Sequence, residues 1–366
     1  METSPERKPE KPRIEWMDAL RGIAIMLVVF EHSTRFVHQE LGSSFIPVLD
    51  PISDTLNPIR MPAMAFLSGL LLAPSLAKGA APYLWGKVRN VAWPFVVWSF
   101  LYISAWIVAA PISGTPHSYA EMGAILWDPP GHLWYLRDLF VFYLVSLAIH
   151  ALPASRSPGG RTLAMLGAAA LSVTACALTR TEDGQGQFER IFFLGAFFLL
   201  GGWFSAQPRK VEALLSDPRV AIAAVATALL LIPVAMTLGN VRYDWRSVPL
   251  TLAGIVSMAL VTRSLCRTAA SPALRFMGRT SLTIYVFHWI VVAGTAIVVA
   301  KLVPDIPPAA MTLLVFGVGM AASLAMVFLA RRVPALDILF SFPRSPRRAA
   351  SPGQPTAPRA HAVPKR

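Results

Sequence analysis

The chain alternates long apolar stretches with short polar segments over most of its length. A helix needs roughly 20 mainly apolar residues to cross a bilayer. Ten stretches approach this length, and each predicts a membrane-spanning helix. They cover residues 17–36, 59–76, 91–112, 133–152, 162–179, 191–206, 220–238, 248–262, 282–300 and 309–330. The pattern predicts an all-α, polytopic integral membrane protein with a membrane domain at residues 14–333.

Lys and Arg residues fall unevenly on the segments between these stretches. The two ends of the chain and every second loop hold 24 of the 33 Lys and Arg residues, whereas the alternate loops hold 5. Because basic residues are enriched in cytoplasmic loops, this alternation predicts that both termini are cytoplasmic. Residues 1–13 form a polar tail, and no small-residue cleavage site follows the first apolar run, so we expect a retained first helix. Residues 334–366 are rich in Pro, Ala, Ser and Arg, which predicts a disordered basic tail attracted to anionic lipid headgroups.

Composition excludes several classes of protein. Hydrophobic residues make up 55% and charged residues 14% of the chain, against about 25% charged in soluble domains. A soluble enzyme, a disordered chain and a secreted disulfide scaffold are therefore excluded. The two cysteines, Cys176 and Cys266, form no CxxC pair, so we expect no disulfide framework and no metal site. The net charge of +13 is spread over loops without a stacking platform, which argues against nucleic-acid binding.

The first stretch carries charges that a bilayer disfavours. Charge at the centre of a membrane helix costs at least ~2.5–3.5 kcal/mol, so such residues suggest function. Arg21 and His32 are 11 residues apart, which places them on one face of a helix and ~16 Å apart along its axis. Asp18 precedes Arg21 by three residues and is placed to pair with it. Asp18 and Arg35 equally suit the membrane interfaces.

Other polar residues lie within or beside the remaining stretches. Arg60, His132 and Arg137 are predicted toward the outer side, and His288 about two turns inside the ninth stretch. Taken singly, each suits an interface anchor, but together they suggest a polar passage. Lys87, Arg89 and Arg279 lie on the predicted cytoplasmic side.

Several motifs give the chain a family resemblance. The stretch "RIEWMDALRGIAIMLVVFEH" resembles the first helix of the acyltransferase 3 family, which is marked by an Arg, ten residues and a His. "RMPAMAFLSGLLL", "KVRNVAWPFVVW", "HLWYL" and "MGRTSLTIYVFH" resemble four further motifs of that family, in the same order. The chain departs from the family pattern at Glu31, where Gly is usual, and at Arg60, where His is usual. The resemblance covers residue 13 to about residue 290.

The resemblance implies transfer of an acyl group, usually acetyl, from cytoplasmic acyl-CoA to a hydroxyl of a sugar or glycan. Acyl-CoA is then a co-substrate, and no cofactor is bound permanently. The implied setting is a bacterial cytoplasmic membrane, with a carbohydrate or glycolipid acceptor and membrane lipid as partners.

Roles for individual residues follow from this implied reaction. A positioned imidazole takes a proton from an attacking hydroxyl, so His32 is the predicted general base. Arg21 is predicted to bind the phosphate or carbonyl of the donor. Glu31 points about 100° away from His32 in a helix and is expected to pair with Arg35. The remaining candidates are Arg89, Lys87 and Arg279 for CoA, then Arg60, His132, Trp134, Arg137 and His288 for the acceptor, and Asp18, Ser68, Gly69 and Ser281 as structural residues.

Two other classes of function stay open from the sequence. Ten helices with buried charges also fit a transporter or flippase that moves a glycan or lipid without acyl chemistry. The absence of a visible internal repeat and the Arg21–His32 stripe count against transport. A non-catalytic scaffold is the third alternative, but a scaffold needs no intramembrane histidine.

Overall fold

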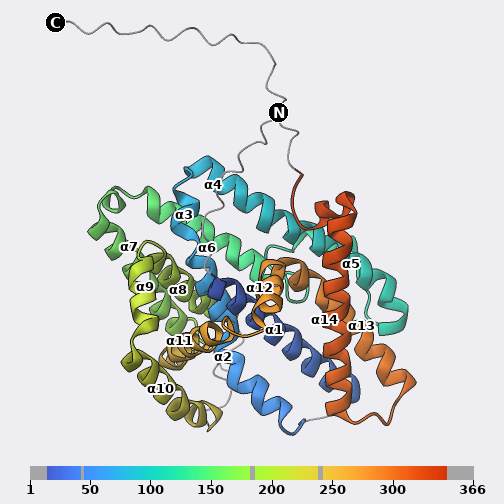
Figure 1. Ribbon diagram of the computed structural model, residues 1–366. Helices are drawn as coiled ribbons and strands as arrows, with labels where there is room; N and C mark the ends of the chain where they lie inside the picture. Colours follow the sequence, from blue (N-terminus) through green and yellow to red (C-terminus); the bar gives the residue numbers. More distant parts are fainter. Residues whose placement is uncertain (1–14, 43–44, 182–185, 238–241, 344–366) are drawn as a thin grey trace, which may run out of the picture.

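The computed structural model describes residues 15–42, 45–181, 186–237 and 242–343. These residues contain helices and turns and no strand (Figure 1). The longer helices are α1 Glu15–Leu41, α2 Leu49–Gly69, α5 Trp93–Ser113, α6 Trp134–Ala151, α7 Pro158–Leu178, α8 Gln187–Ser205, α10 Pro218–Thr237, α11 Val248–Leu265, α13 Ser281–Leu302 and α14 Pro308–Arg332. Shorter helices are α3 Leu72–Leu76, α4 Ala80–Lys87, α9 Pro208–Ser216 and α12 Ser271–Arg279, with 3-10 or π segments η1 Val88–Ala92, η2 Tyr119–Gly123, η3 Pro153–Arg156, η4 Trp245–Ser247 and η5 Pro334–Leu339.

Each of the ten predicted stretches coincides with a long helix. Within the described ranges, eight helical segments are long and apolar enough to cross a membrane, and a ninth is obtained if α9 and α10, bent by 73°, count as one span. Helix α1 does not reach that apolarity, because charged and histidine residues interrupt it. The fold is therefore that of an all-α polytopic membrane protein.

Helix α1 lies in the interior of the bundle (Figure 1). It packs against α12, α13, α14, α2 and α11. This surrounding shell explains how α1 tolerates buried polar residues such as His32, which faces other helices rather than lipid.

Glycines let two helix pairs approach closely. A Cβ atom at Gly22 of α1 would lie 2.1 Å from the carbonyl oxygen of Leu274 in α12. In the same way, a Cβ at Gly69 of α2 would lie 2.1 Å from the carbonyl oxygen of Phe198 in α8. Small residues at such contacts are a common means of packing membrane helices. The structural role predicted for Gly69 fits this contact.

The chain is ordered beyond residue 333, where the sequence predicted a disordered tail. The 3-10 helix η5 packs against α14 and α5. The indoles of Trp93 and Trp98 donate hydrogen bonds to the carbonyl oxygens of Ile338 (2.6 Å) and Leu339 (2.8 Å). Order therefore extends at least to residue 343, and the rest of the predicted tail lies outside the described residues.

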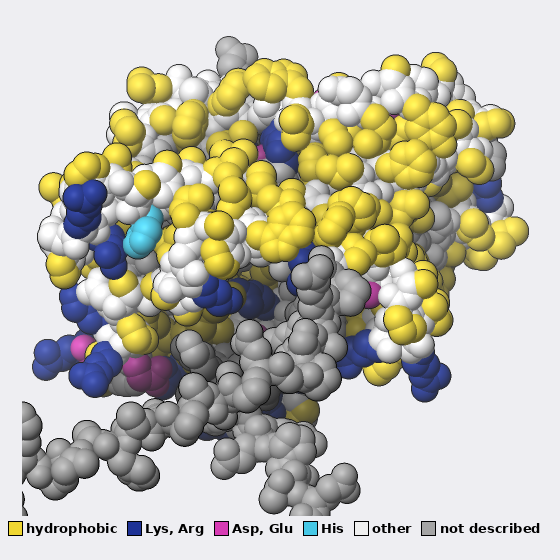
Figure 2. Space-filling model, turned by 90° about the horizontal axis from the view of Figure 1, so that it is seen from above, with side chains coloured by type: hydrophobic (Ala, Val, Ile, Leu, Met, Phe, Trp, Pro, Cys, Tyr) yellow, Lys and Arg dark blue, Asp and Glu magenta, His cyan; other side chains and the backbone are white. Residues whose placement is uncertain are grey.

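Hydrophobic and basic side chains occupy different parts of the surface. Figure 2 shows a broad hydrophobic area over the upper half of that view, with most Lys and Arg side chains gathered in the lower half. This separation is expected of a protein whose middle faces lipid and whose loops face water.

Candidate active site

Three histidines from distant parts of the chain meet in the interior. Nδ1 of His32 in α1 lies 3.0 Å from Nε2 of His288 in α13. The ring of His132, just before α6, lies 4.8 Å from the His288 ring and 5.7 Å from the His32 ring. The three residues are 8%, 0% and 2% exposed, in the order His32, His288 and His132. The structure thus brings together three of the residues predicted for chemistry or acceptor binding.

Aromatic side chains and backbone carbonyls hold this histidine cluster in place. Trp289 stacks on the ring of His132 at 5.1 Å and contacts the ring of His32 at 4.7 Å. Nε2 of His132 donates to the carbonyl oxygen of Tyr285 at 2.5 Å, and the Tyr285 hydroxyl donates to the carbonyl oxygen of His132. These reciprocal bonds join α13 to the segment that leads into α6.

The histidine cluster does not have the geometry of a metal site. No group of three or more His, Cys, Asp or Glu residues in the described part of the chain is placed to hold a metal ion. Nε2 of His132 and Nδ1 of His288 already bond to carbonyl oxygens, which also limits their use as ligands. The arrangement is suited to moving protons instead.

Glu31 pairs with residues that the sequence did not connect to it. Its Oε1 lies 2.6 Å from Nη2 of Arg242 and 3.2 Å from Nη2 of Arg60, and its Oε2 lies 3.3 Å from Nε2 of His32. The amide oxygen of Asn57 accepts hydrogen bonds from both arginines. The predicted pairing of Glu31 with Arg35 is therefore wrong, because its arginine partners are Arg60 of α2 and Arg242. Glu31 was also expected to point away from His32, whereas its side chain folds back beside that ring.

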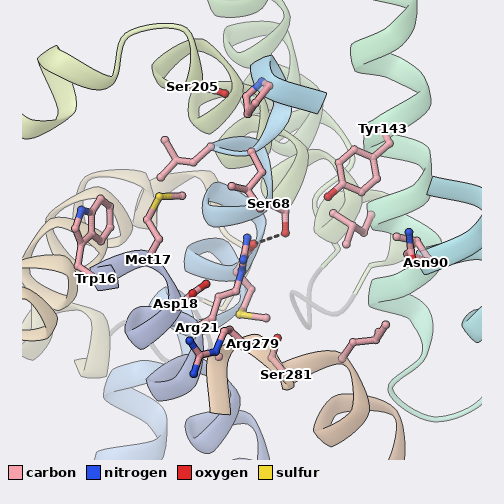
Figure 3. A pocket seen from close by; sticks show the side chains of 18 of the residues that line it. Trp16, Met17, Asp18, Arg21, Ser68, Asn90, Tyr143, Ser205, Arg279 and Ser281 are labelled. Atoms are coloured by element: carbon pink, nitrogen blue, oxygen red, sulfur yellow. Dashed lines mark hydrogen bonds between the residues drawn. The ribbon is translucent and has the colours of Figure 1, made fainter. Parts of the chain in front are cut away.

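A cavity of about 970 Å³ opens at the other end of α1. Its walls come from several helices and mix apolar and aromatic side chains with two acidic residues, Asp18 and Glu212, and two basic ones, Arg21 and Arg279. Figure 3 shows Tyr143 of α6 and Asn90 of η1 on one side of the cavity and the other labelled polar residues on the opposite side. Those other residues are Asp18, Arg21, Ser68, Ser205, Arg279 and Ser281. This volume is of the size that small-molecule sites occupy in proteins.

Arg21 and Arg279 supply positive charge to the cavity. Nη2 of Arg21 donates to the carbonyl oxygen of Leu67 at 3.2 Å, which ties α1 to α2. Asp18 lines the same cavity one turn before Arg21, but the described residues show no ion pair between the two side chains, so the predicted pairing is not seen. Ser68 bonds to the carbonyl oxygen of Met64 within its own helix at 2.8 Å. A site with two guanidinium groups is suited to bind a phosphate-bearing ligand.

Tyr285 connects the cavity with the histidine cluster. Its side chain lines the cavity, and its ring lies 4.5 Å from the ring of His132. The distance from Arg21 to His32 along α1 is ~16 Å. None of the three histidines lines the cavity, so the cavity and the histidine cluster are neighbouring parts of the candidate site with Tyr285 between them.

Lys87 and Arg89, both predicted to bind CoA, differ in their position relative to the cavity. Nζ of Lys87 sits 3.7 Å from the ring centre of Tyr143, which lines the cavity, so Lys87 borders it. Arg89 instead donates to the hydroxyl of Ser341 at 3.0 Å and does not line the cavity, whereas its neighbour Asn90 does. The structure therefore gives Arg89 a role in holding the C-terminal segment rather than in the cavity.

Asn90 and Arg89 lie in η1, a π-helical turn between α4 and α5. Pro94 has no N–H, so the carbonyl group of Asn90 lacks its α-helical donor, which favours a wider turn. Such π-helical turns are frequent at functional sites.

Arg137 and Trp134 lie apart from the histidine cluster, in contacts that stabilise the fold. Nε of Arg137 donates to Asp138 at 2.8 Å, and its Nη1 donates to the carbonyl oxygens of Leu126 and Trp127. The guanidinium of Arg190 lies 4.2 Å from the ring centre of Trp134. Their predicted role in acceptor binding stays a prediction.

The residues that sequence reasoning missed are Arg242, Tyr285 and Trp289. Arg242 carried a usable signal, since it is one of only 5 basic residues in the predicted outer loops. Because Lys and Arg are usually enriched in cytoplasmic loops, a basic residue in an outer loop is a candidate for a buried ion pair.

The fold and the site together define a multi-pass membrane protein with a buried histidine cluster and a neighbouring cavity that two arginines line. An acyltransferase 3 family model, described as an acyltransferase domain, matches residues 14–332. The chain therefore belongs to this family of membrane acyltransferases. A comparison with curated proteins finds no match. Family membership favours acyl transfer over the transporter and scaffold alternatives.

Proposed function

We propose that the protein transfers an acetyl group from cytoplasmic acetyl-CoA to a hydroxyl of a sugar or glycan in the bacterial cytoplasmic membrane. One observation carries this proposal. The cavity at Arg21 and the buried imidazole of His32 lie at the two ends of one helix, and Tyr285, which lines the cavity, contacts His132 of the histidine cluster. A donor bound in the cavity would reach the base that activates the acceptor.

The donor end suits the chemistry of CoA. Arg21 and Arg279 bring positive charge to the cavity, and Lys87 borders it, which matches the phosphates of CoA. Apolar residues such as Met64 and Leu282 line the same space and suit the pantetheine and acyl parts. Because these residues lie at the predicted cytoplasmic end, the donor would enter from the cytoplasm.

The acceptor end suits activation of an alcohol. A hydroxyl is a poor nucleophile near neutral pH, and His32 takes its proton as the oxygen attacks the thioester carbonyl. The new C–O bond forms as the C–S bond breaks, and the thiolate of CoA leaves and receives the proton. Arg60 and His132 lie next to His32 and would help to bind the acceptor. The alternative function, transport of a glycan without acyl chemistry, would release no CoA thiol.

Thiol release tests the proposal directly. Purified protein in lipid vesicles is incubated with acetyl-CoA and a mixture of envelope glycans, and free CoA thiol is measured with time. We expect release by the wild type and a loss of ~10²–10⁴-fold in His32→Ala. Arg35→Ala, an exposed change on the same helix, is the matched control and should retain activity. A fully active His32→Ala protein would sink the mechanism, and glycan movement without thiol release would support a transporter.

A further inference from the structure

The hydrogen bonds of His288 determine which ring nitrogen of His32 carries a proton. Nδ1 of His288 lies 3.0 Å from the carbonyl oxygen of Ile284, which only accepts, so this nitrogen holds the hydrogen. In a neutral ring, Nε2 of His288 is then an acceptor. Its partner at 3.0 Å is Nδ1 of His32, which must be the donor. Neutral His32 therefore carries its hydrogen on Nδ1 and a free electron pair on Nε2.

Glu31 lies next to that free electron pair. Oε2 of Glu31 is 3.3 Å from Nε2 of His32, while Oε1 faces the guanidinium groups of Arg60 and Arg242. Asn57 bonds to both arginines and links their positions. The carboxylate is thus oriented by three side chains outside its own helix. A carboxylate at this distance makes no hydrogen bond to the neutral ring, but its negative charge stabilises the imidazolium as an ion pair.

We propose that His288 and Glu31 are the two positioning residues of His32, and that Nε2 of His32 is the basic atom. This inference rests on the proposed acyl transfer. His288 fixes the tautomer of His32 by accepting the hydrogen bond from Nδ1 of His32. This role replaces the acceptor-binding role predicted for His288. Glu31, oriented by Arg60 and Arg242, stabilises the imidazolium that forms when Nε2 takes the proton of the acceptor hydroxyl.

The site is therefore complementary to the reacting state more than to the resting state. As the acceptor oxygen attacks, its proton moves to Nε2, the C–O bond forms and the C–S bond breaks. The imidazolium is then stabilised by the charge of Glu31 beside Nε2 and donates a hydrogen bond through Nδ1 to His288. It returns the proton to the CoA thiolate, which leaves as the thiol. Interactions that strengthen only in this state raise kcat rather than substrate affinity.

Kinetics of Glu31→Gln provide the first test. The loss of the carboxylate charge beside the imidazolium should lower kcat by about 10- to 100-fold. The KM for acyl-CoA should not change, because the donor cavity lies at the other end of α1. In a His32→Ala background, Glu31→Gln should have no further effect, since it acts through that ring. Arg35→Gln is the matched charge control on α1 and should keep wild-type kinetics.

A double variant separates positioning from stability. Glu31→Gln alone leaves two arginines without their carboxylate, which destabilises buried pairs. Glu31→Gln with Arg242→Gln keeps the net charge of the group, so we expect it to fold like the wild type and to retain the low kcat. Recovery of wild-type kcat in this double variant would overturn the proposal.

The tautomer of His32 is tested by substitutions of His288 and by NMR spectroscopy. Gln at position 288 offers an oxygen that accepts from Nδ1 of His32, whereas Leu offers none, so His288→Gln should retain more activity than His288→Leu. In protein labelled with ¹⁵N-histidine, the His32 signals, assigned with His32→Gln, should show the hydrogen on Nδ1. A hydrogen on Nε2 in the neutral ring would overturn the proposal. Absence of thiol release by the wild type would instead contradict the proposed function.

Discussion

The backbone of Gly278 in α12 lies directly against the backbone of Asp18 in α1. A Cβ atom at Gly278 would stand 1.7 Å from the carbonyl oxygen of Asp18. This contact places Arg279, the next residue, beside Arg21 at the cavity. The two basic residues of the donor end are therefore brought together by the absence of a side chain.

Gly278→Val should separate α1 from α12. No flexible side chain is available to move away, because the obstructing atom belongs to the backbone. Overpacking costs about 1–3 kcal/mol in well-packed interiors, and here we expect at least that. Thermal denaturation of the detergent-solubilised protein should show a lower Tm. Gly294→Val on α13, where a Cβ has nothing within 4 Å, is the control and should keep the wild-type Tm. Equal Tm values for both variants would contradict the contact.

Arg21→Ala should weaken the use of acyl-CoA. Loss of a charge-assisted hydrogen bond to the donor corresponds to about a 10- to 100-fold rise in the KM for acyl-CoA. His32 and its partners lie at the other end of α1, so the apparent KM for the acceptor should stay unchanged. Isothermal titration with CoA measures the same loss without turnover. Unchanged CoA binding would remove this role from Arg21.

The long helices could be predicted from the sequence, whereas several short elements could not. Apolar runs near 20 residues located all ten long helices, because the bilayer fixes their length. Helix α2 begins at Leu49, ten residues before its predicted start, since Asp50 and Asp54 interrupt the apolar pattern there. The short helices α9 and α12 are amphipathic, and a search for long apolar runs passes over them.

The sequence predicted that Arg21 and His32 lie on one face of α1, but it did not predict which residues of other helices contact Glu31. Helical spacing placed Arg21 and His32 on one face, and the structure has both at the candidate site. The same spacing rule suggested Arg35 for Glu31, because it sees only neighbours within a helix. The real partner, Arg242, is 211 residues away in sequence, so only the fold reveals it. Contacts of this kind depend on packing order, which periodicity does not encode.

Asp138→Asn should destabilise the protein without changing donor binding. Asp138 is fully buried and faces Arg137 (2.7 Å) and Arg190 (3.3 Å). Removing its charge leaves two guanidinium groups without their carboxylate, which costs about 3–5 kcal/mol for buried pairs. The Tm should fall well below that of Asp305→Asn, an exposed control. A normal Tm combined with weaker acceptor use would instead support the acceptor-binding role predicted for Arg137.

The C-terminal segment should influence the donor end through α4 and η1. Arg89 bonds to the hydroxyl of Ser341, and its carbonyl oxygen accepts from the N–H of Phe342 at 3.1 Å. The ring of Phe342 also packs against Trp93 at 4.8 Å and Trp85 at 5.6 Å. These contacts fix the turn from which Asn90 reaches the cavity.

Two truncations measure this influence. Deletion of residues 334–366 removes every contact of the segment, so we expect η1 to loosen and the KM for acyl-CoA to rise severalfold. Deletion of residues 344–366 keeps those contacts and should leave the kinetics at wild-type values. The single change Phe342→Ala should fall between the two, because it removes the ring packing but keeps the backbone bond to Arg89. If both truncations behave alike, the segment does not act on the donor end, and the ordered contacts to Arg89 serve stability alone.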